Sequence, residues 1–229
     1  MQGFKGKVFF WSYLIVVLVN LVSHGFALPI LELISKPLLM PLLAGFVLVN
    51  LSGAHNNLKL LLFGALLFSW IGDVALLFDK AYPILFIVGL GGFLVAHIQY
   101  IFLFVKSAGR VTITKVGPFV VVTVIILYTG YLIQLLWPHL NELKIPVAIY
   151  ALVLMIMGIS AVTRIGVGGR VLVIIGALFF VVSDSILAIN KFYEPIQHGR
   201  ILTMFTYTIA QLLIVLGIIK VIGFKSETN

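Results

Sequence analysis

The sequence has no cysteine, and charged residues are scarce in it. Only 10% of its 229 residues are charged, whereas 62% are hydrophobic and the mean hydropathy is +1.23. Soluble domains average about 25% charged and about 45–50% apolar residues. The composition therefore excludes a soluble globular domain, a disordered chain and a nucleic-acid-binding protein, although the formal net charge is +8. The absence of cysteine excludes disulfides, thiolate metal sites and cysteine nucleophiles.

Eight apolar runs, separated by polar or turn-forming clusters, predict eight membrane-spanning helices. At about 20 residues per span, such a chain has no room for a separate soluble domain. We expect an all-α, polytopic bundle that forms one integral-membrane domain over residues 1–229. Pro37 and Pro41 are expected in the first turn of the second span, where proline is tolerated. The predicted spans are 8–27, 37–53, 58–78, 82–105, 116–136, 145–163, 171–189 and 200–222.

Lysine and arginine are divided unevenly between the two ends of these spans. One end, which holds both termini and the 106–115 and 164–170 loops, carries 10 of them, and the other end carries 5. Loops rich in lysine and arginine stay on the cytoplasmic side of a membrane. We therefore expect both termini in the cytoplasm, and a location in the inner membrane of a bacterium.

Asp73 and Asp184 are the acidic residues that lie well inside predicted spans. Asp73 lies 14 residues after Lys59, and Asp184 lies 14 residues after Arg170, where each basic residue marks the inner edge of its span. Fourteen residues correspond to about 21 Å of helix. A carboxylate at mid-depth in a bilayer costs at least about 2.5–3.5 kcal/mol. We interpret the pair as an acid beside a base in one polar cavity in the outer half of the membrane. The alternative is that each carboxyl braces a neighbouring helix, with Lys36 as a partner.

Other polar residues in or near the spans are candidates for binding a substrate, and for each a helix-packing role is the alternative. A lone intramembrane histidine with two aspartates is thin support for a metal site, so none is expected. Lys36 follows the first span and is expected nearer Asp73, where its positive charge keeps that carboxyl ionised. This favours Asp184 as the acid. The candidates are Lys36, His97, Tyr100, Tyr150, Ser183, Tyr207 and Gln211.

A short internal sequence similarity suggests a weak repeat of four spans followed by four spans. Gly64-Ala65-Leu66 precedes Asp73, and Gly176-Ala177-Leu178 precedes Asp184, with an offset of one residue. Apolar matches of this length arise easily by chance, so the repeat is a minor part of the predicted fold.

Five segments together resemble the YhhN-like family of eight-span membrane proteins, whose animal members are lysoplasmalogenases. The match covers nearly the whole chain, and the segment that ends in Ser-Asp-Ser with its Ala-Ile-Asn-Lys-Phe tail is the most specific. The segments are Lys36-Pro37-Leu38, Ser-Trp-Ile-Gly-Asp-Val-Ala-Leu-Leu at 69–77, Ala-His-Ile-Gln-Tyr at 96–100, the run 176–192, and Tyr-Thr-Ile-Ala-Gln at 207–211.

The resemblance implies hydrolysis of the vinyl-ether bond of lysoplasmalogens, which gives a fatty aldehyde and a glycerophospho-base. It places the family's two intramembrane aspartates on Asp73 and Asp184, and its Lys-Pro element on Lys36. Acid cleavage of an enol ether requires neither a metal nor an organic cofactor. The expected partners are a lysophospholipid substrate and the lipid bilayer. No protein partner can be read from the sequence.

Two rival functions fit parts of the pattern. Paired intramembrane acids also serve as proton relays, so a proton-coupled transporter of a small or lipid substrate is the main alternative. Cleavage of an ester or amide lipid is the second. That chemistry usually needs a serine–histidine pair or a metal, and the sequence supports neither well.

Overall fold

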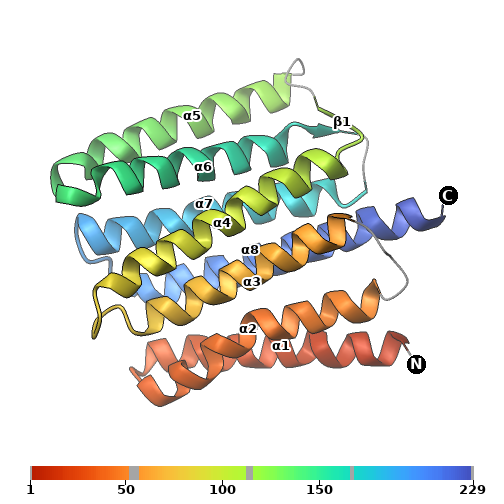
Figure 1. Cartoon of the computed structure of the whole chain (residues 1–229), viewed down its shortest axis with the longest axis horizontal. Coiled ribbons are helices and arrows are strands. Elements are labelled where there is room, and N and C mark those ends of the chain that lie inside the picture. The colour runs from red at the N-terminus through yellow and green to blue at the C-terminus, as the bar shows by residue number, and fades with distance from the viewer. Residues whose placement is uncertain (1, 52–56, 112–115, 166–167, 228–229) are drawn as a thin grey trace. The chain divides into compact units, whose positions relative to one another are not determined.

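The computed structural model contains eight long helices in the residues that it describes, which are all except 1, 52–56, 112–115, 166–167 and 228–229 (Figure 1). Besides two single 3₁₀ turns, η1 (Trp137–His139) and η2 (Asn141–Leu143), these residues include one pair of two-residue strands. The helices are α1 (Gln2–Gly25), α2 (Pro29–Asn50), α3 (Asn57–Leu77), α4 (Ile84–Ser107), α5 (Val116–Leu136), α6 (Lys144–Val162), α7 (Arg170–Phe192) and α8 (Gly199–Glu227).

All eight helices are long and apolar enough to cross a membrane. Their apolar stretches run for 21 to 24 residues with a mean hydropathy between 1.7 and 2.5. Such lengths match the roughly 20 residues that span a hydrocarbon core. The expected all-α architecture with eight spans is therefore confirmed, and the chain is an integral, multi-pass membrane protein.

The chain divides into two compact units. Unit 1 comprises residues 1–103 and 218–229, and unit 2 comprises residues 104–217. The boundary falls near the end of α4, where a four-plus-four arrangement would also divide the spans. The expectations of a repeat and of a single domain stay predictions.

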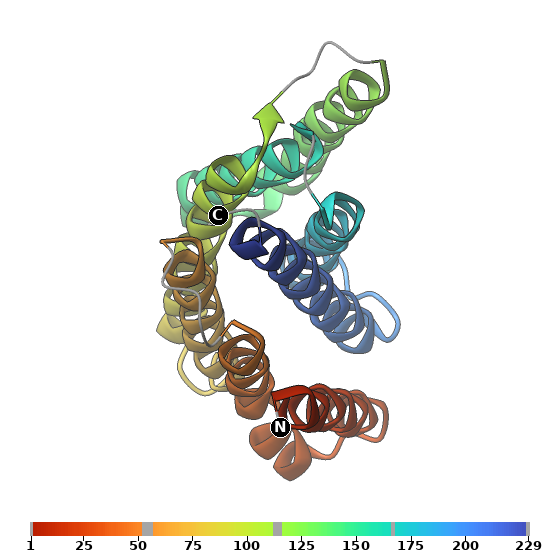
Figure 2. The ribbon, with the colours of Figure 1, turned by 90° about the vertical axis from the view of Figure 1, so that its right-hand side faces the viewer.

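In unit 1, α1 packs along α2 (Figure 2). The buried side of α1 presents Gly6, Tyr13 and Asn20, which follow one another at seven-residue intervals and so lie on one stripe of the helix. The Asn20 side-chain amide donates a 3.0 Å hydrogen bond to the Ser35 hydroxyl oxygen on α2. A polar stripe on the first helix thus faces protein rather than lipid.

The helix α2 begins eight residues earlier than the sequence pattern predicted. Pro29 occupies its first turn, and Pro37 and Pro41 lie inside the helix. The expectation that these two prolines mark the helix start was wrong. Pro41 has no N–H to offer the Pro37 carbonyl one turn earlier, and the Trp70 indole N–H donates to that carbonyl at 2.9 Å instead. Proline is tolerated in a membrane helix where a neighbouring helix satisfies the freed carbonyl in this way.

Small residues bring α3 and α4 into close contact. A side chain at Gly92 would lie 2.9 Å from the Phe68 carbonyl oxygen, and one at Gly72 would lie 2.7 Å from the Phe93 ring. Helices in membranes associate through such close backbone approaches. Gly92 of α4 therefore serves packing, and Asp73 follows a point where α4 presses against α3.

In unit 2, α6 packs against both α5 and α7, and the strands β1 (Arg110–Val111) and β2 (Arg164–Ile165) form an antiparallel pair. The Arg164 side chain is fully buried beside this pair. Its Nη2 donates to the Ser107 hydroxyl oxygen at 2.9 Å, and its guanidinium lies 5.6 Å from the centre of the Phe104 ring. Burial and the charge of Arg170 lower the pKa of Arg164 to about 10, so the group remains charged at neutral pH.

The start of α7 is fixed against α8 by glycine. Gly169, the residue before α7, has a φ of +68°, and a side chain there would lie 2.2 Å from the Gly217 carbonyl oxygen. Eight residues before Asp184, Gly176 makes a similar approach to the Ala210 carbonyl. Both glycines hold α7 against α8, and Asp184 lies further along the same helix.

Candidate active site

Asp73 lies in the buried interior of unit 1, four residues before the end of α3. Its side chain is 1% exposed. The Tyr13 hydroxyl from α1 lies within electrostatic range of Asp73 and also of Tyr100 from α4. Both tyrosines are fully or almost fully buried. Three helices therefore bring one carboxyl and two phenol groups into one neighbourhood.

His97 and Lys36 come from the helices that flank α3. His97 is fully buried and precedes Tyr100 by three residues, so the two side chains share the buried face of α4. Lys36 is 7% exposed and directly precedes Pro37, whose carbonyl accepts the Trp70 hydrogen bond. Since Trp70 is one turn from Asp73, Lys36 lies at the same end of the α2–α3 pair as Asp73.

Asp184 is the centre of a second polar set, in unit 2. The Tyr150 hydroxyl on α6 donates a 2.6 Å hydrogen bond to Asp184 Oδ2 on α7. This distance is in the range of charge-assisted O–H···O⁻ bonds. One oxygen of the carboxyl is therefore fixed by α6.

The remaining candidates of unit 2 surround that pair along α7 and α8. The Ser183 hydroxyl donates to the Thr203 carbonyl at 3.1 Å and so links α7 to α8 beside Asp184. The ring of Tyr207 packs edge-on against Phe180, one turn before Asp184, at 5.5 Å between centroids. Gln211, one turn after Tyr207, is fully buried.

The nine candidate residues thus divide into two groups. Unit 1 holds Lys36, Asp73, His97 and Tyr100, and unit 2 holds Tyr150, Ser183, Asp184, Tyr207 and Gln211. Each aspartate lies on an unbroken helix that also contains the basic residue 14 positions earlier, so about 21 Å of helix separates the two residues in each case. Their meeting in one cavity stays a prediction.

Tyr13 belongs to the Asp73 neighbourhood and was missing from the sequence-based candidates. No residue of the first span was among these candidates. A signal was available, because Tyr13 and Asn20 are seven residues apart and the intervening residues are largely apolar. A polar stripe of that period marks a helix face that is turned away from lipid.

No group of three or more histidine, aspartate or glutamate side chains within the described part of the chain is placed to hold a metal ion. The candidate residues around the two aspartates carry phenol, imidazole and ammonium groups. These groups transfer protons and stabilise charge.

Comparisons with known proteins agree on one family. The profile of the YhhN family matches residues 31–218. The human lysoplasmalogenase TMEM86B (Homo sapiens) is 34% identical over 180 residues, which cover 78% of this chain and 71% of that protein. The human lysoplasmalogenase TMEM86A is 30% identical over 186 residues, covering 77% and 70%. A lysoplasmalogenase of Mycobacterium bovis is 30% identical over 137 residues, covering 58% and 50%.

No solved structure is significantly similar to the chain. The family assignment therefore rests on sequence, and it covers both polar sets, since residues 31–218 include Asp73 and Asp184. On these matches, the chain belongs to the YhhN family.

Proposed function

We propose that this protein is a lysoplasmalogenase, which hydrolyses the vinyl-ether bond of a lysoplasmalogen to a fatty aldehyde and a glycerophospho-base. The observation that carries the proposal is the set of relatives named lysoplasmalogenase, which includes animal and bacterial proteins. The two aspartates inside membrane-spanning helices supply groups suited to that reaction.

The reaction needs a proton donor and a general base, and the two aspartates fit these roles. A protonated carboxyl delivers a proton to the vinyl carbon distal to the ether oxygen, which leaves an oxocarbenium ion at the other carbon. A carboxylate stabilises this cation and takes a proton from the attacking water. The resulting hemiacetal then breaks its C–O bond, and the released alkoxy oxygen is protonated. Glycosidases solve the same oxocarbenium problem with two carboxyl groups.

Asp73 and Asp184 act as a pair in this proposal. Two coupled carboxyl groups titrate together, so the proposal assigns the roles of acid and base to the pair and not to either aspartate alone. Tyr150 holds one oxygen of Asp184 and is a positioning residue for it. Catalysis then needs the two units to act as one domain over residues 1–229, with both carboxyls at one substrate.

Polar residues around the aspartates are proposed to bind the rest of the lipid. The ammonium group of Lys36 suits the anionic phosphate of the head group, because it lies at the Asp73 end of α2 and α3. Six other side chains are available for the glycerol hydroxyls and for orienting the vinyl ether. They are His97, Tyr100, Tyr150, Ser183, Tyr207 and Gln211.

The proposed orientation places both termini at the cytoplasmic face of a bacterial inner membrane. The support is the division of lysine and arginine, 10 against 5, between the two ends of the spans. With this orientation the aspartates lie in the outer half of the membrane, and Lys36 is near the outer surface.

The test is an assay of the purified protein with three matched lipids: a lysoplasmalogen, its saturated ether analogue and its ester analogue. We expect free aldehyde from the lysoplasmalogen alone. Release of fatty acid from the ester analogue would instead favour the rival function, cleavage of an ester lipid. If the protein leaves all three lipids intact but moves protons in proteoliposomes, it is a transporter and the proposed function is wrong.

A further inference from the structure

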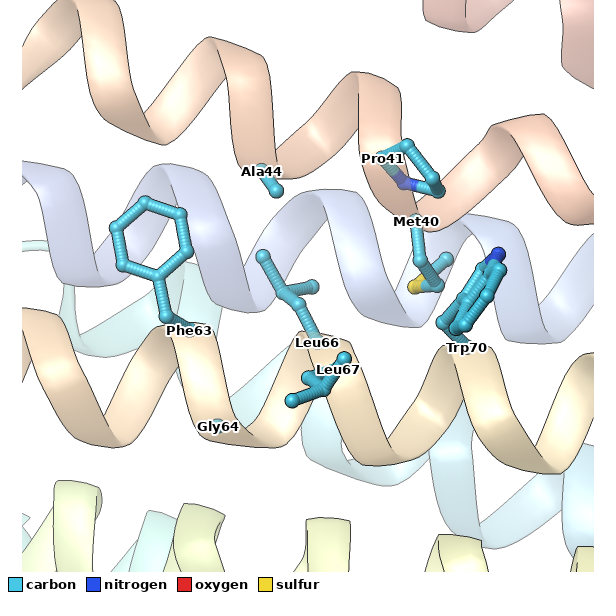
Figure 3. A pocket seen from close by; sticks show the side chains of 8 residues that line it. All are labelled: Met40, Pro41, Ala44, Phe63, Gly64, Leu66, Leu67 and Trp70. Atoms are coloured by element: carbon cyan, nitrogen blue, oxygen red, sulfur yellow. The ribbon is translucent and has the colours of Figure 1, made fainter.

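An apolar groove runs between α2 and α3 within unit 1, with a cavity volume of about 430 Å³. Met40, Pro41 and Ala44 line it from α2, and Phe63, Leu66 and Trp70 line it from α3 (Figure 3). The volume falls in the range of about 300–1,000 Å³ that is typical of small-molecule sites. Every side chain that lines the groove is apolar, apart from the indole N–H of Trp70.

That one polar group is already satisfied. The indole N–H of Trp70 donates to the Pro37 carbonyl, which Pro41 leaves without its helical partner. Trp70 therefore presents its ring, not a donor, to the groove. The same hydrogen bond fixes Trp70 at the end of the groove nearest Asp73, which is one helical turn further along α3.

The groove runs along α3 from Trp70, one helical turn before Asp73, toward the middle of the helix. Figure 3 shows Trp70, Met40 and Pro41 at one end, with Ala44 and Phe63 toward the other. Going from Asp73 back along α3, Trp70 comes first and Phe63 last. Ten residues of helix, or about 15 Å, separate Asp73 from Phe63. Because Phe63 to Trp70 is the central part of α3, the groove lies at the depth of lipid tails.

We propose that this groove binds the alkenyl chain of the single-chain ether lipid whose vinyl-ether bond lies at Asp73. The order of groups along α2 and α3 is the order of groups along such a lipid. Lys36 is at the head-group end, Asp73 is at the level of the reactive bond, and the apolar groove follows. The inference rests on the proposed function and adds to it the specificity for chain length.

Chain length is the property that tests the groove. Ala44→Phe places a ring at the end far from Asp73, and we expect it to lower kcat/KM for a 1-octadecenyl lysoplasmalogen by about tenfold while a 1-decenyl substrate changes less than about twofold. Phe63→Ala removes the far wall of the groove. We expect it to raise kcat/KM for the 1-octadecenyl substrate relative to that for the 1-decenyl substrate. Leu60→Phe and Leu60→Ala are the matched controls, since Leu60 lies on α3 outside the groove and is 72% exposed.

The outcomes separate this inference from the proposed function. If the wild type hydrolyses lysoplasmalogens and the groove variants keep its chain-length ratio, the groove is not the chain site, although the proposed function stands. If the wild type hydrolyses no lysoplasmalogen, the proposed function fails and binding is tested directly.

The binding test uses the wild type and a saturated-ether lysophospholipid with a diazirine at the end of its chain. Irradiation should label α2 and α3 near Ala44 and Phe63, and an excess of unlabelled lysophospholipid should prevent this labelling. Moving the diazirine next to the ether oxygen should move the label toward Trp70. Label spread over lipid-facing helices without competition would overturn the inference, whatever the activity of the variants.

Discussion

The Tyr150 hydroxyl donates a 2.6 Å hydrogen bond to Asp184 Oδ2, and so joins α6 to α7 at the carboxyl of the second polar set. Hydrogen bonds to charged groups contribute about 1.5–3 kcal/mol. If Asp184 takes part in catalysis, this bond fixes the orientation of its carboxyl group. Tyr150 is then a residue that acts on the reaction through Asp184.

We expect Tyr150→Phe to lower kcat by about 10–150-fold, because a loss of about 1.5–3 kcal/mol corresponds to that range. KM should change little, and the pH dependence of kcat should shift. Tyr131→Phe is the control, since Tyr131 is 64% exposed and faces away from the protein interior. A purely structural role would instead lower the melting temperature and leave kcat and the pH dependence unchanged.

Asp73→Asn and Asp184→Asn should each reduce turnover by about 10²–10⁴-fold or more, because an amide replaces neither a general acid nor a general base. Both variants should remain folded and extractable, since asparagine keeps the size of the side chain. The control is Glu194→Gln, which changes an exposed carboxyl between α7 and α8. Wild-type activity in either aspartate variant would remove that residue from the reaction.

The sequence was sufficient to place all eight spans, because apolar runs of about 20 residues leave few alternatives in a membrane. It failed at α2, where the preference of proline for a helix start pointed to Pro37. The helix begins at Pro29, and a tryptophan from another helix satisfies the carbonyl that Pro41 frees. Such compensation depends on a contact 33 residues away and is invisible in local propensity.

The candidate site was predictable to a similar extent. Residue counts along the helices selected Asp73 and Asp184 as candidates, and Tyr150, another candidate, is hydrogen-bonded to Asp184 in the structure. The partner of a buried group depends on the rotational orientation of each helix about its axis, and residue counts do not give this orientation. For this reason the Tyr13 neighbourhood was missed, and the meeting of the two aspartates stays a prediction.

The hydrogen bond from Trp70 to the Pro37 carbonyl, which Pro41 leaves without its helical partner, predicts a non-additive effect on stability. Trp70→Phe leaves the Pro37 carbonyl without a donor and should cost about 1–3 kcal/mol. Pro41→Ala restores an N–H for that carbonyl, so Trp70→Phe should cost less in the Pro41→Ala background. Thermal unfolding of the four proteins in one detergent measures the coupling. Equal costs in both backgrounds would mean that the hydrogen bond does not compensate for Pro41.

The orientation of the bundle is tested by reporter fusions. A fusion in the 106–115 loop should report a cytoplasmic location, and one at residues 193–198 should report the opposite side, because the first loop carries three basic residues and no acidic one. Fusions after truncation can misplace a span, so the reporters are inserted into the full chain. Exchanged locations would invert the orientation and put the aspartates in the inner half of the membrane.

The proposed chemistry leaves a mark on its product. If a carboxyl protonates the vinyl ether, the transferred proton ends on the carbon next to the new aldehyde. Carboxyl protons exchange with solvent, so turnover in D₂O should give aldehyde with one deuterium at that carbon. Proton transfer to carbon is slow, and a positioned acid accelerates it by about 10²–10⁴-fold. We therefore expect a normal solvent isotope effect on the rate, and activity that falls at high pH as the acid loses its proton.

The measurement is mass spectrometry of the aldehyde after rapid chemical trapping, because an aldehyde slowly exchanges hydrogen at the same carbon with the solvent. Unlabelled aldehyde mixed into D₂O with the protein and trapped after the same interval gives the background. One deuterium per molecule above that background identifies protonation at carbon. An aldehyde with no deuterium means that the carbon received no exchangeable proton, and a two-aspartate mechanism of this kind is then excluded, whichever residues prove essential.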